Sequence, residues 1–93
     1  MSKQRFSSVW DALEDTQGDA ANMKARAELM RAITEYIRSN GMTQAEAAKT
    51  LGVTQPRVSD LMRGKVDVFS IDTLVNMLAA AEIRLEMRLR KAA

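Results

Sequence analysis

The sequence predicts a compact, mostly α-helical domain that ends in one β-strand. Three observations predict this fold class. Apolar residues recur at helical spacing between residues 23 and 37 and again between residues 74 and 81. Residues 43–64 hold two short stretches that begin with cap residues and end at a glycine, as short helices do. Residues 83–90 alternate strictly between apolar and charged side chains, which is typical of a strand with one buried face.

Length and composition indicate one small domain and weigh against catalysis. The chain has 93 residues, which suits a single domain. It contains neither Cys nor His, so it lacks a thiol nucleophile, a disulfide, and the commonest general base and metal ligand. We therefore expect no enzymatic activity, no cofactor and no metal site. The seven Met residues are dispersed, and we interpret them as fillers of the core.

Charge and hydropathy restrict the partners. The net charge is +2, which permits nucleic-acid binding without requiring it, because a local basic patch matters more than the total. No apolar run near the N-terminus is suited to export, and none elsewhere is long enough to span a membrane. We expect a cytoplasmic protein without membrane contact.

Residues 1–15 form the predicted N-terminal arm, which has no clear period. It carries Phe6, Val9, Trp10 and Leu13 in a stretch that suits a short helix or strand. One interpretation is a flap that packs on the edge of the core. The other is a docking segment for a second protein. Acidic residues between positions 11 and 19 are interpreted as a solvated surface at a helix N-terminus, and the alternatives are catalytic carboxylates or a contact with a basic partner protein.

Residues 16–82 form the predicted main domain, which starts with a long helix. Thr16 is the expected N-cap, and the helix runs to Ser39, where Asn40 and Gly41 end it. Its apolar stripe comprises Met23, Ala27, Leu29, Met30, Ile33, Tyr36 and Ile37.

Two short helices are expected next, over residues 44–51 and 55–63. Thr43 and Glu46 have the spacing of a capping box at the start of the first. Thr54 is the expected N-cap of the second, and Pro56 lies in its first turn, where a missing N–H costs nothing. Gly64 ends it.

The spacing of small and apolar residues in this pair predicts a helix-turn-helix motif. Ala48 lies where the second helix crosses closely, and Gly52 opens the turn, where a positive φ is expected. Val53 fills the space beneath the turn, and Val58 and Leu61 form the inward face of the second helix. These residue types at these offsets between two caps indicate a DNA-binding motif.

Ser70 caps a last predicted helix over residues 71–81, whose expected inward face comprises Leu74, Val75, Leu78 and Ala81. Residues 83–93 are the expected dimerisation strand and tail. A lone strand leaves an unpaired edge, so we expect it to pair antiparallel with a second copy of the chain. The expected interface residues are Ile83, Leu85, Met87 and Leu89.

Charge favours one register for this pairing. With the strands centred on Leu85, Glu82 faces Arg88 of the second copy and Arg84 faces Glu86, so all pairs are of opposite sign. The alternative is a strand that pairs within one chain against residues 6–9.

Residues 43–61 (TQAEAAKTLGVTQPRVSDL) resemble the lambda-repressor/Cro-like class of helix-turn-helix regulators. The wider chain is similar to a narrower branch, the compact HigA-like antitoxins, which are often encoded beside a RelE/HigB-type toxin. This second resemblance is carried by Val9, Trp10, Arg26, Leu29, Met30, Gly64, Lys65, Phe69 and Leu74.

The resemblance implies that the second helix of the motif enters the major groove. It implies base contacts from Gln55, Arg57, Ser59 and Asp60, and phosphate contacts from Gln44, Thr54, Arg63 and Lys65. Gln55 suits adenine, and Arg57 suits guanine or a phosphate. Asp60 is unexpected on a DNA-binding surface, because its carboxylate repels phosphates. This carboxylate suits a contact with the amino group of cytosine or with a neighbouring Arg. We interpret Lys49 as a solvated surface charge.

Together these features predict a sequence-specific repressor that binds a palindromic operator as a homodimer. The resemblance further implies the antitoxin of a type II pair, which autoregulates its operon and binds a RelE/HigB-type toxin. The alternatives are a stand-alone or phage-type regulator without a toxin, and a protein-interaction module that does not bind DNA.

Overall fold

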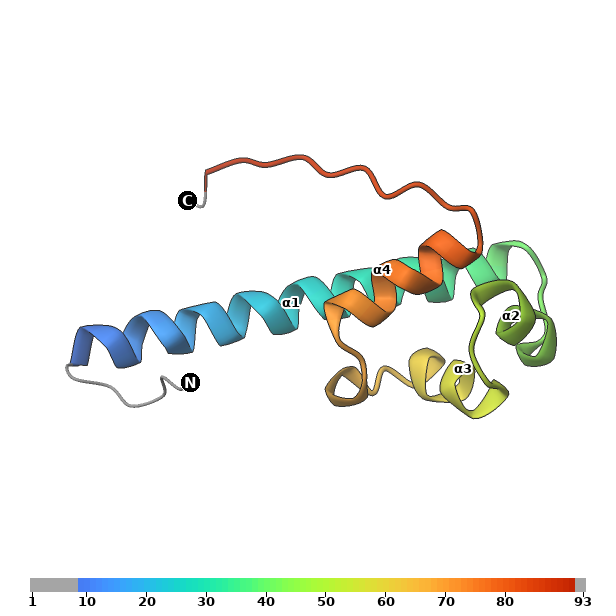
Figure 1. Ribbon diagram of the computed structural model, residues 1–93, viewed down its shortest axis with the longest axis horizontal. Helices are drawn as coiled ribbons and strands as arrows, with labels where there is room; N and C mark the ends of the chain where they lie inside the picture. The colour runs from blue at the N-terminus through green and yellow to red at the C-terminus, as the bar shows by residue number, and fades with distance from the viewer. Residues whose placement is uncertain (1–8, 92–93) are drawn as a thin grey trace.

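The computed structural model describes the backbone of residues 9–91 and the side chains of residues 18–91. A long first helix extends across the molecule, and the shorter helices pack against its C-terminal part (Figure 1). The elements in chain order are α1 (Val9–Ser39), α2 (Gln44–Leu51), α3 (Gln55–Met62), the short 3-10 helix η1 (Val66–Val68) and α4 (Ile71–Ala80). The mostly helical fold class predicted from the sequence is confirmed.

One hydrophobic core joins all these helices. It is formed by side chains of α1, α2, α3 and α4 together with Phe69, which follows η1. Its buried residues are Met30, Ile33, Ile37, Ala47, Ala48, Leu51, Val58, Leu61, Phe69, Leu74, Met77 and Leu78. Because α2 and α3 each contribute side chains to this core, the core fixes the orientation of the helix pair on α1 and α4.

The long helix begins earlier than the sequence predicted. Thr16 is not an N-cap but an interior residue, since α1 already begins at Val9. Ala12, Leu13 and Glu14 are good helix formers, the only proline of the chain is at position 56, and Gly18 alone costs a helix about 1 kcal/mol. The second half of the predicted arm is therefore helical. Phe6 and the rest of residues 1–8 lie outside the described residues.

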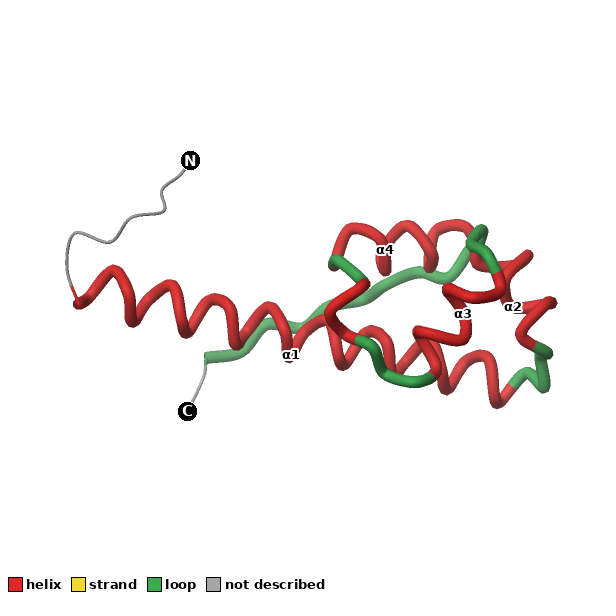
Figure 2. The backbone as a smooth tube through the Cα atoms, turned by 90° about the horizontal axis from the view of Figure 1, so that it is seen from below, coloured by secondary structure: helices red, strands yellow, loops and turns green. Residues whose placement is uncertain are grey.

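The predicted apolar stripes are largely correct. Met30, Ile33 and Ile37 are buried as expected, whereas Met23 is 45% exposed. The N-terminal part of α1 projects beyond the other helices (Figure 2). In α4 the predicted inward residue Val75 is exposed, and the inward face comprises Leu74, Met77 and Leu78.

The predicted C-terminal strand is not formed in the part of the chain that the structure describes. Residues 83–91 are extended but make no backbone ladder (Figure 2), because a strand requires a partner and one copy offers none there. Ile83 is half-buried against the core, while Met87 is 79% and Leu89 is 92% exposed. Of the segment proposed as the alternative partner, Val9 is helical and residues 6–8 are not described.

Candidate nucleic-acid interface

The capping box at the start of α2 is confirmed. The Glu46 amide donates to Thr43 Oγ1 at 3.1 Å, and the Thr43 amide donates to Glu46 Oε1 at 2.9 Å. Gln44 is the first residue of α2 and is exposed. The N-terminus of α2 is thus fixed by two side chains and presents the Gln44 amide group to solvent.

The turn between α2 and α3 has the geometry that the glycine predicted. Gly52 adopts φ +70°, which is the left-handed conformation that favours glycine. The Val53 amide donates to the Ala48 carbonyl at 3.0 Å, and Val53 packs against the core. A Cβ at Gly52 would lie 3.4 Å from Ala80 Cβ, so the turn also sits close to the end of α4. These contacts hold α2 and α3 in a helix-turn-helix.

Thr54 occupies the N-cap position of α3, but its side chain makes no cap hydrogen bond, contrary to the prediction. Pro56 has no N–H to donate, and the amides of Arg57 and Val58 already donate to the Thr54 carbonyl at 3.1 and 3.2 Å. The exposed Thr54 hydroxyl therefore remains free for a partner at the N-terminus of α3.

The polar face of α3 is opposite its buried face. Val58 and Leu61 are buried in the core. Gln55, Ser59 and Arg63 are spaced by four residues and so share one side of the helix axis. Gln55 and Arg63 are exposed and Ser59 is half-buried. The structure thus brings two predicted base-contacting residues and one predicted phosphate-contacting residue together on one surface.

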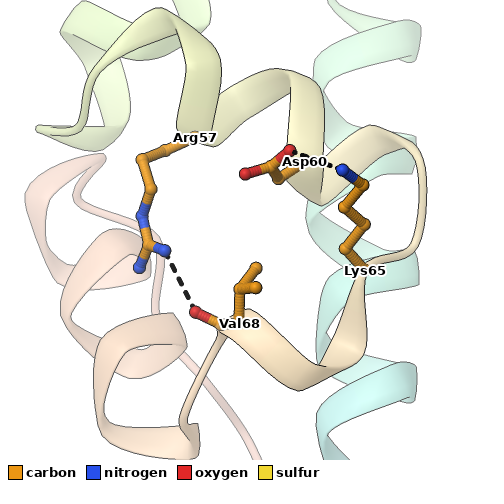
Figure 3. A network of polar contacts seen from close by, with 4 residues as sticks. All are labelled: Arg57, Asp60, Lys65 and Val68. Atoms are coloured by element: carbon orange, nitrogen blue, oxygen red, sulfur yellow. Dashed lines mark hydrogen bonds and ion pairs between the residues drawn. The ribbon is translucent and has the colours of Figure 1, made fainter.

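The acid on this helix is paired with a lysine. Asp60 Oδ1 lies 3.5 Å from the Nζ of Lys65, which follows the end of α3 (Figure 3). The sequence had suggested a neighbouring Arg as the partner of this carboxylate. Because both side chains are partly exposed, the pair adds little to stability. Its effect is to compensate a negative charge on a surface that also carries Arg63.

Arg57 points away from this polar face and towards the chain between α3 and α4. Its Nη1 donates to the Val68 carbonyl at 3.0 Å (Figure 3), and its Cζ lies 4.4 Å from the centre of the Phe69 ring. Two residues along a helix differ by about 200°, so Arg57 and Ser59 project about 160° apart. The predicted base contact of Arg57 is therefore placed apart from Gln55 and Ser59.

Comparisons with known proteins agree with this geometry. A family model described as a helix-turn-helix domain matches residues 12–90. The chain belongs to this helix-turn-helix family. One similar solved structure is described as a transcriptional regulator of the XRE family; it is 34% identical, covers 80% of this chain and 83% of its own, and has a TM-score of 0.70. No curated protein matches the chain.

The chain is thus an XRE-family helix-turn-helix regulator that binds DNA, and its family is not enzymatic. This confirms the helix-turn-helix part of the resemblance. Among the described residues, no group of His, Cys, Asp and Glu side chains could hold a metal ion. No described helix is both long and apolar enough to cross a membrane.

In this XRE-family regulator, a second arginine, Arg26 of α1, binds the same connecting segment. Arg26 of α1 donates from Nη1 to the carbonyls of Val66 and Phe69 at 3.1 and 3.4 Å. Its Nε donates to Asn22 Oδ1 at 2.8 Å, which fixes the side chain along α1. Residue spacing does not predict this contact, because it joins residues that are 40 and 43 positions apart.

Two further basic residues of the regulator lie beside α3 and were not predicted as part of the site. Arg31 and Arg38 of α1 line a hollow of about 300 Å³ together with Met62 and Gly64 at the end of α3. Their spacing of seven residues places them on one side of α1, and this spacing was the available signal.

Proposed function

We propose that the regulator reads DNA sequence with the polar face of α3, from Gln55 and Ser59. The observation that carries this proposal is that this face is turned away from the buried Val58 and Leu61 and begins at the first residue of the second helix of the motif. A second helix in this setting enters the major groove. The Gln55 amide suits adenine, and the Ser59 hydroxyl suits either donor or acceptor groups on base edges.

Asp60 extends this face by one side chain. Its Oδ1 is paired with Lys65, which leaves the second carboxylate oxygen to accept from the amino group of cytosine. The nearby lysine offsets the repulsion between this carboxylate and phosphates.

Phosphates would be held at the two ends of the motif. Gln44 and Thr54 lie at the N-termini of α2 and α3, where backbone amides favour an anion. Arg63 and Lys65 lie beyond the C-terminal end of α3 and are exposed. These contacts would fix the position of α3 in the groove, whereas the base contacts would select the sequence.

Selection of duplexes from a random-sequence pool tests the reading by α3. We expect the wild-type protein to enrich one motif, and Gln55→Ala to relax the preference at one base pair at a cost of about 1–3 kcal/mol. Asn76→Ala is the matched control, because Asn76 is an exposed amide on α4. A motif unchanged by Gln55→Ala, or changed equally by the control, would contradict the reading by α3.

We further propose that the regulator is a homodimer joined by residues 83–90. These residues pass over a hollow of about 800 Å³, which is lined by apolar side chains of α1 and α4, among them Leu29 and Val75. Leu85, Met87 and Leu89 line it too but stay exposed in one copy, so a second copy has apolar surface to cover.

The charge pattern of this segment supports antiparallel pairing centred on Leu85, since Glu82 would face Arg88 and Arg84 would face Glu86 of the second copy. Such a two-fold dimer would place two α3 helices on half-sites about one helical turn apart, so we propose a palindromic operator.

The antitoxin role is the most specific part of the proposal. It rests on the similarity to HigA-like antitoxins, in which the regulator represses its own operon and binds a RelE/HigB-type toxin. We expect the adjacent gene to encode a small basic protein, and co-expression of the regulator to protect cells from it. Deletion of residues 1–15 tests whether the predicted arm docks the toxin, and unchanged protection by a folded truncation would assign the toxin surface elsewhere. A neighbouring gene whose product is harmless would favour a stand-alone or phage-type regulator.

A further inference from the structure

We propose that Arg57 is a positioning residue, which sets the orientation of α3 through Phe69 and Val68 instead of contacting a base. This inference rests on the proposed reading of DNA by α3. Its starting point is the segment from Val66 to Phe69, which joins α3 to α4. Arg26 reaches this segment from α1, and Arg57 reaches it from α3.

The two arginines connect α3 to α1 through shared backbone. Arg26 donates to the carbonyls of Val66 and Phe69, and Arg57 donates to the carbonyl of Val68 that lies between them. Bonds to three carbonyls within four residues join the segment to both α1 and α3. Because Asn22 in turn accepts from Arg26, the connection starts on a side chain that is itself held on α1.

Phe69 explains why the Arg57 side chain stays in this place. The ring is 1% exposed, and the Arg57 guanidinium lies over it with Cζ 4.4 Å from the ring centre. A guanidinium over an aromatic face is attracted by the ring and shields it from water. If Arg57 turned towards DNA, it would lose this contact and the bond to Val68, and it would uncover the ring.

The place of Arg57 within α3 makes this connection relevant to recognition. Arg57 is two residues from Gln55, at the end of α3 that is proposed to enter the groove, and projects about 160° away from Ser59. The Arg57 side chain thus restrains the N-terminal part of α3 from the side opposite Ser59. A small rotation of this end would displace Gln55 and Ser59 together, so loss of Arg57 should weaken recognition at several base pairs at once.

A double-mutant cycle on DNA affinity tests the proposal. The probe is the duplex that the wild-type protein enriches from a random-sequence pool, and the variants are Arg57→Met, Phe69→Leu and the pair. We expect each single variant to bind the duplex more weakly than the wild-type protein. The double variant should bind no more weakly than the single variant that has the lower affinity. The coupling should be about 2- to 150-fold, as for other side chains in contact. Titrations are made well below the melting temperature of each variant, so they report on folded protein.

Arg63→Met is the matched control, because Arg63 directly follows the same helix, is exposed, and is proposed to contact a phosphate. The fold-loss of DNA affinity in the Arg63→Met, Phe69→Leu double variant should equal the product of the two single fold-losses. Arg63→Met should also lower the slope of log affinity against log salt by about 1. Arg57→Met should leave that slope unchanged. A coupling factor of 1 between Arg57 and Phe69, which means independent effects on affinity, would overturn the proposal. So would a loss of sequence preference at a single base pair only in Arg57→Met.

A second measurement does not require changing the buried ring. Protons of the Arg57 side chain over the ring should be shifted upfield in the NMR spectrum and should stay shifted when the selected duplex is added. Loss of this shift on DNA binding would show that Arg57 leaves the ring, and would overturn the proposal. If no duplex is enriched at all, the proposal that α3 reads DNA sequence is refuted. If a duplex is enriched and Gln55→Ala reduces the sequence preference, the experiments above test the role of Arg57 alone.

Discussion

Replacing Thr43 by alanine and replacing Thr54 by alanine should affect stability differently, although both residues begin a helix of the same motif. The Thr43 hydroxyl accepts a hydrogen bond from the Glu46 amide at 3.1 Å, whereas the Thr54 hydroxyl makes no cap bond. Loss of a bonded cap costs about 1 kcal/mol, within a range of about 0.5–2. We therefore expect Thr43→Ala to lower the free energy of unfolding by about 1 kcal/mol and Thr54→Ala to change it by less than about 0.5 kcal/mol.

Urea denaturation followed by circular dichroism measures both values, and all variants are compared at one protein concentration because dimerisation would contribute to stability. Ser70→Ala is the matched control. Its hydroxyl accepts from the Thr73 amide at 3.1 Å, so it should resemble Thr43→Ala. Equal losses for Thr43→Ala and Thr54→Ala would refute the reasoning from cap geometry.

In DNA binding, Thr54→Ala should have the larger effect of these two variants. The free Thr54 hydroxyl is proposed to contact a phosphate, and a hydrogen bond to a charged group contributes about 1.5–3 kcal/mol. Thr54→Ala should therefore weaken binding to specific and random duplexes alike while leaving stability intact. An unchanged affinity would remove Thr54 from the proposed phosphate contacts.

Three further predictions test the turn, the dimer and the charge contacts. Gly52→Ala and Gly64→Ala should each lose about 1–2 kcal/mol in denaturation, since both glycines have φ above +60° and an added Cβ meets at most an ordinary contact; a far larger loss for Gly52 alone would mean that the turn cannot move from α4. Leu85→Pro removes a ladder donor, so light scattering should show monomers, and a folded dimer would assign the interface elsewhere. Arg63→Gln should reduce the salt slope of DNA binding by about 1 in titrations at several salt concentrations, and an unchanged slope would exclude its phosphate contact.

The helix-turn-helix could be predicted because its determinants are local. The capping box joins Thr43 to Glu46, three residues away, and the cap of α4 joins Ser70 to Thr73 in the same way. Gly52 adopts its positive φ within the turn itself. Each of these features depends on neighbours along the chain, so residue type and spacing suffice to predict it.

The features that the sequence did not predict depend on distant parts of the chain. Arg57 meets Val68 and Phe69 only because α3 and the following segment fold back on each other. The absence of a cap bond at Thr54 follows from backbone bonds around Pro56 that a pattern of residue types does not show. The alternation in residues 83–90 indicates an extended segment with one apolar side, but a strand also requires a partner.

The ratio of affinities for the selected duplex and for a scrambled duplex of equal length and composition tests the central claim most directly. Both are measured by fluorescence anisotropy at one salt concentration, for the wild-type protein and for Gln55→Ala. If α3 reads the sequence, the wild-type ratio should reach about 10³ or more, and Gln55→Ala should lower it by about 5-fold or more through the selected duplex alone. A wild-type ratio near one, or a ratio that Gln55→Ala leaves unchanged, would contradict the claim that α3 reads DNA sequence.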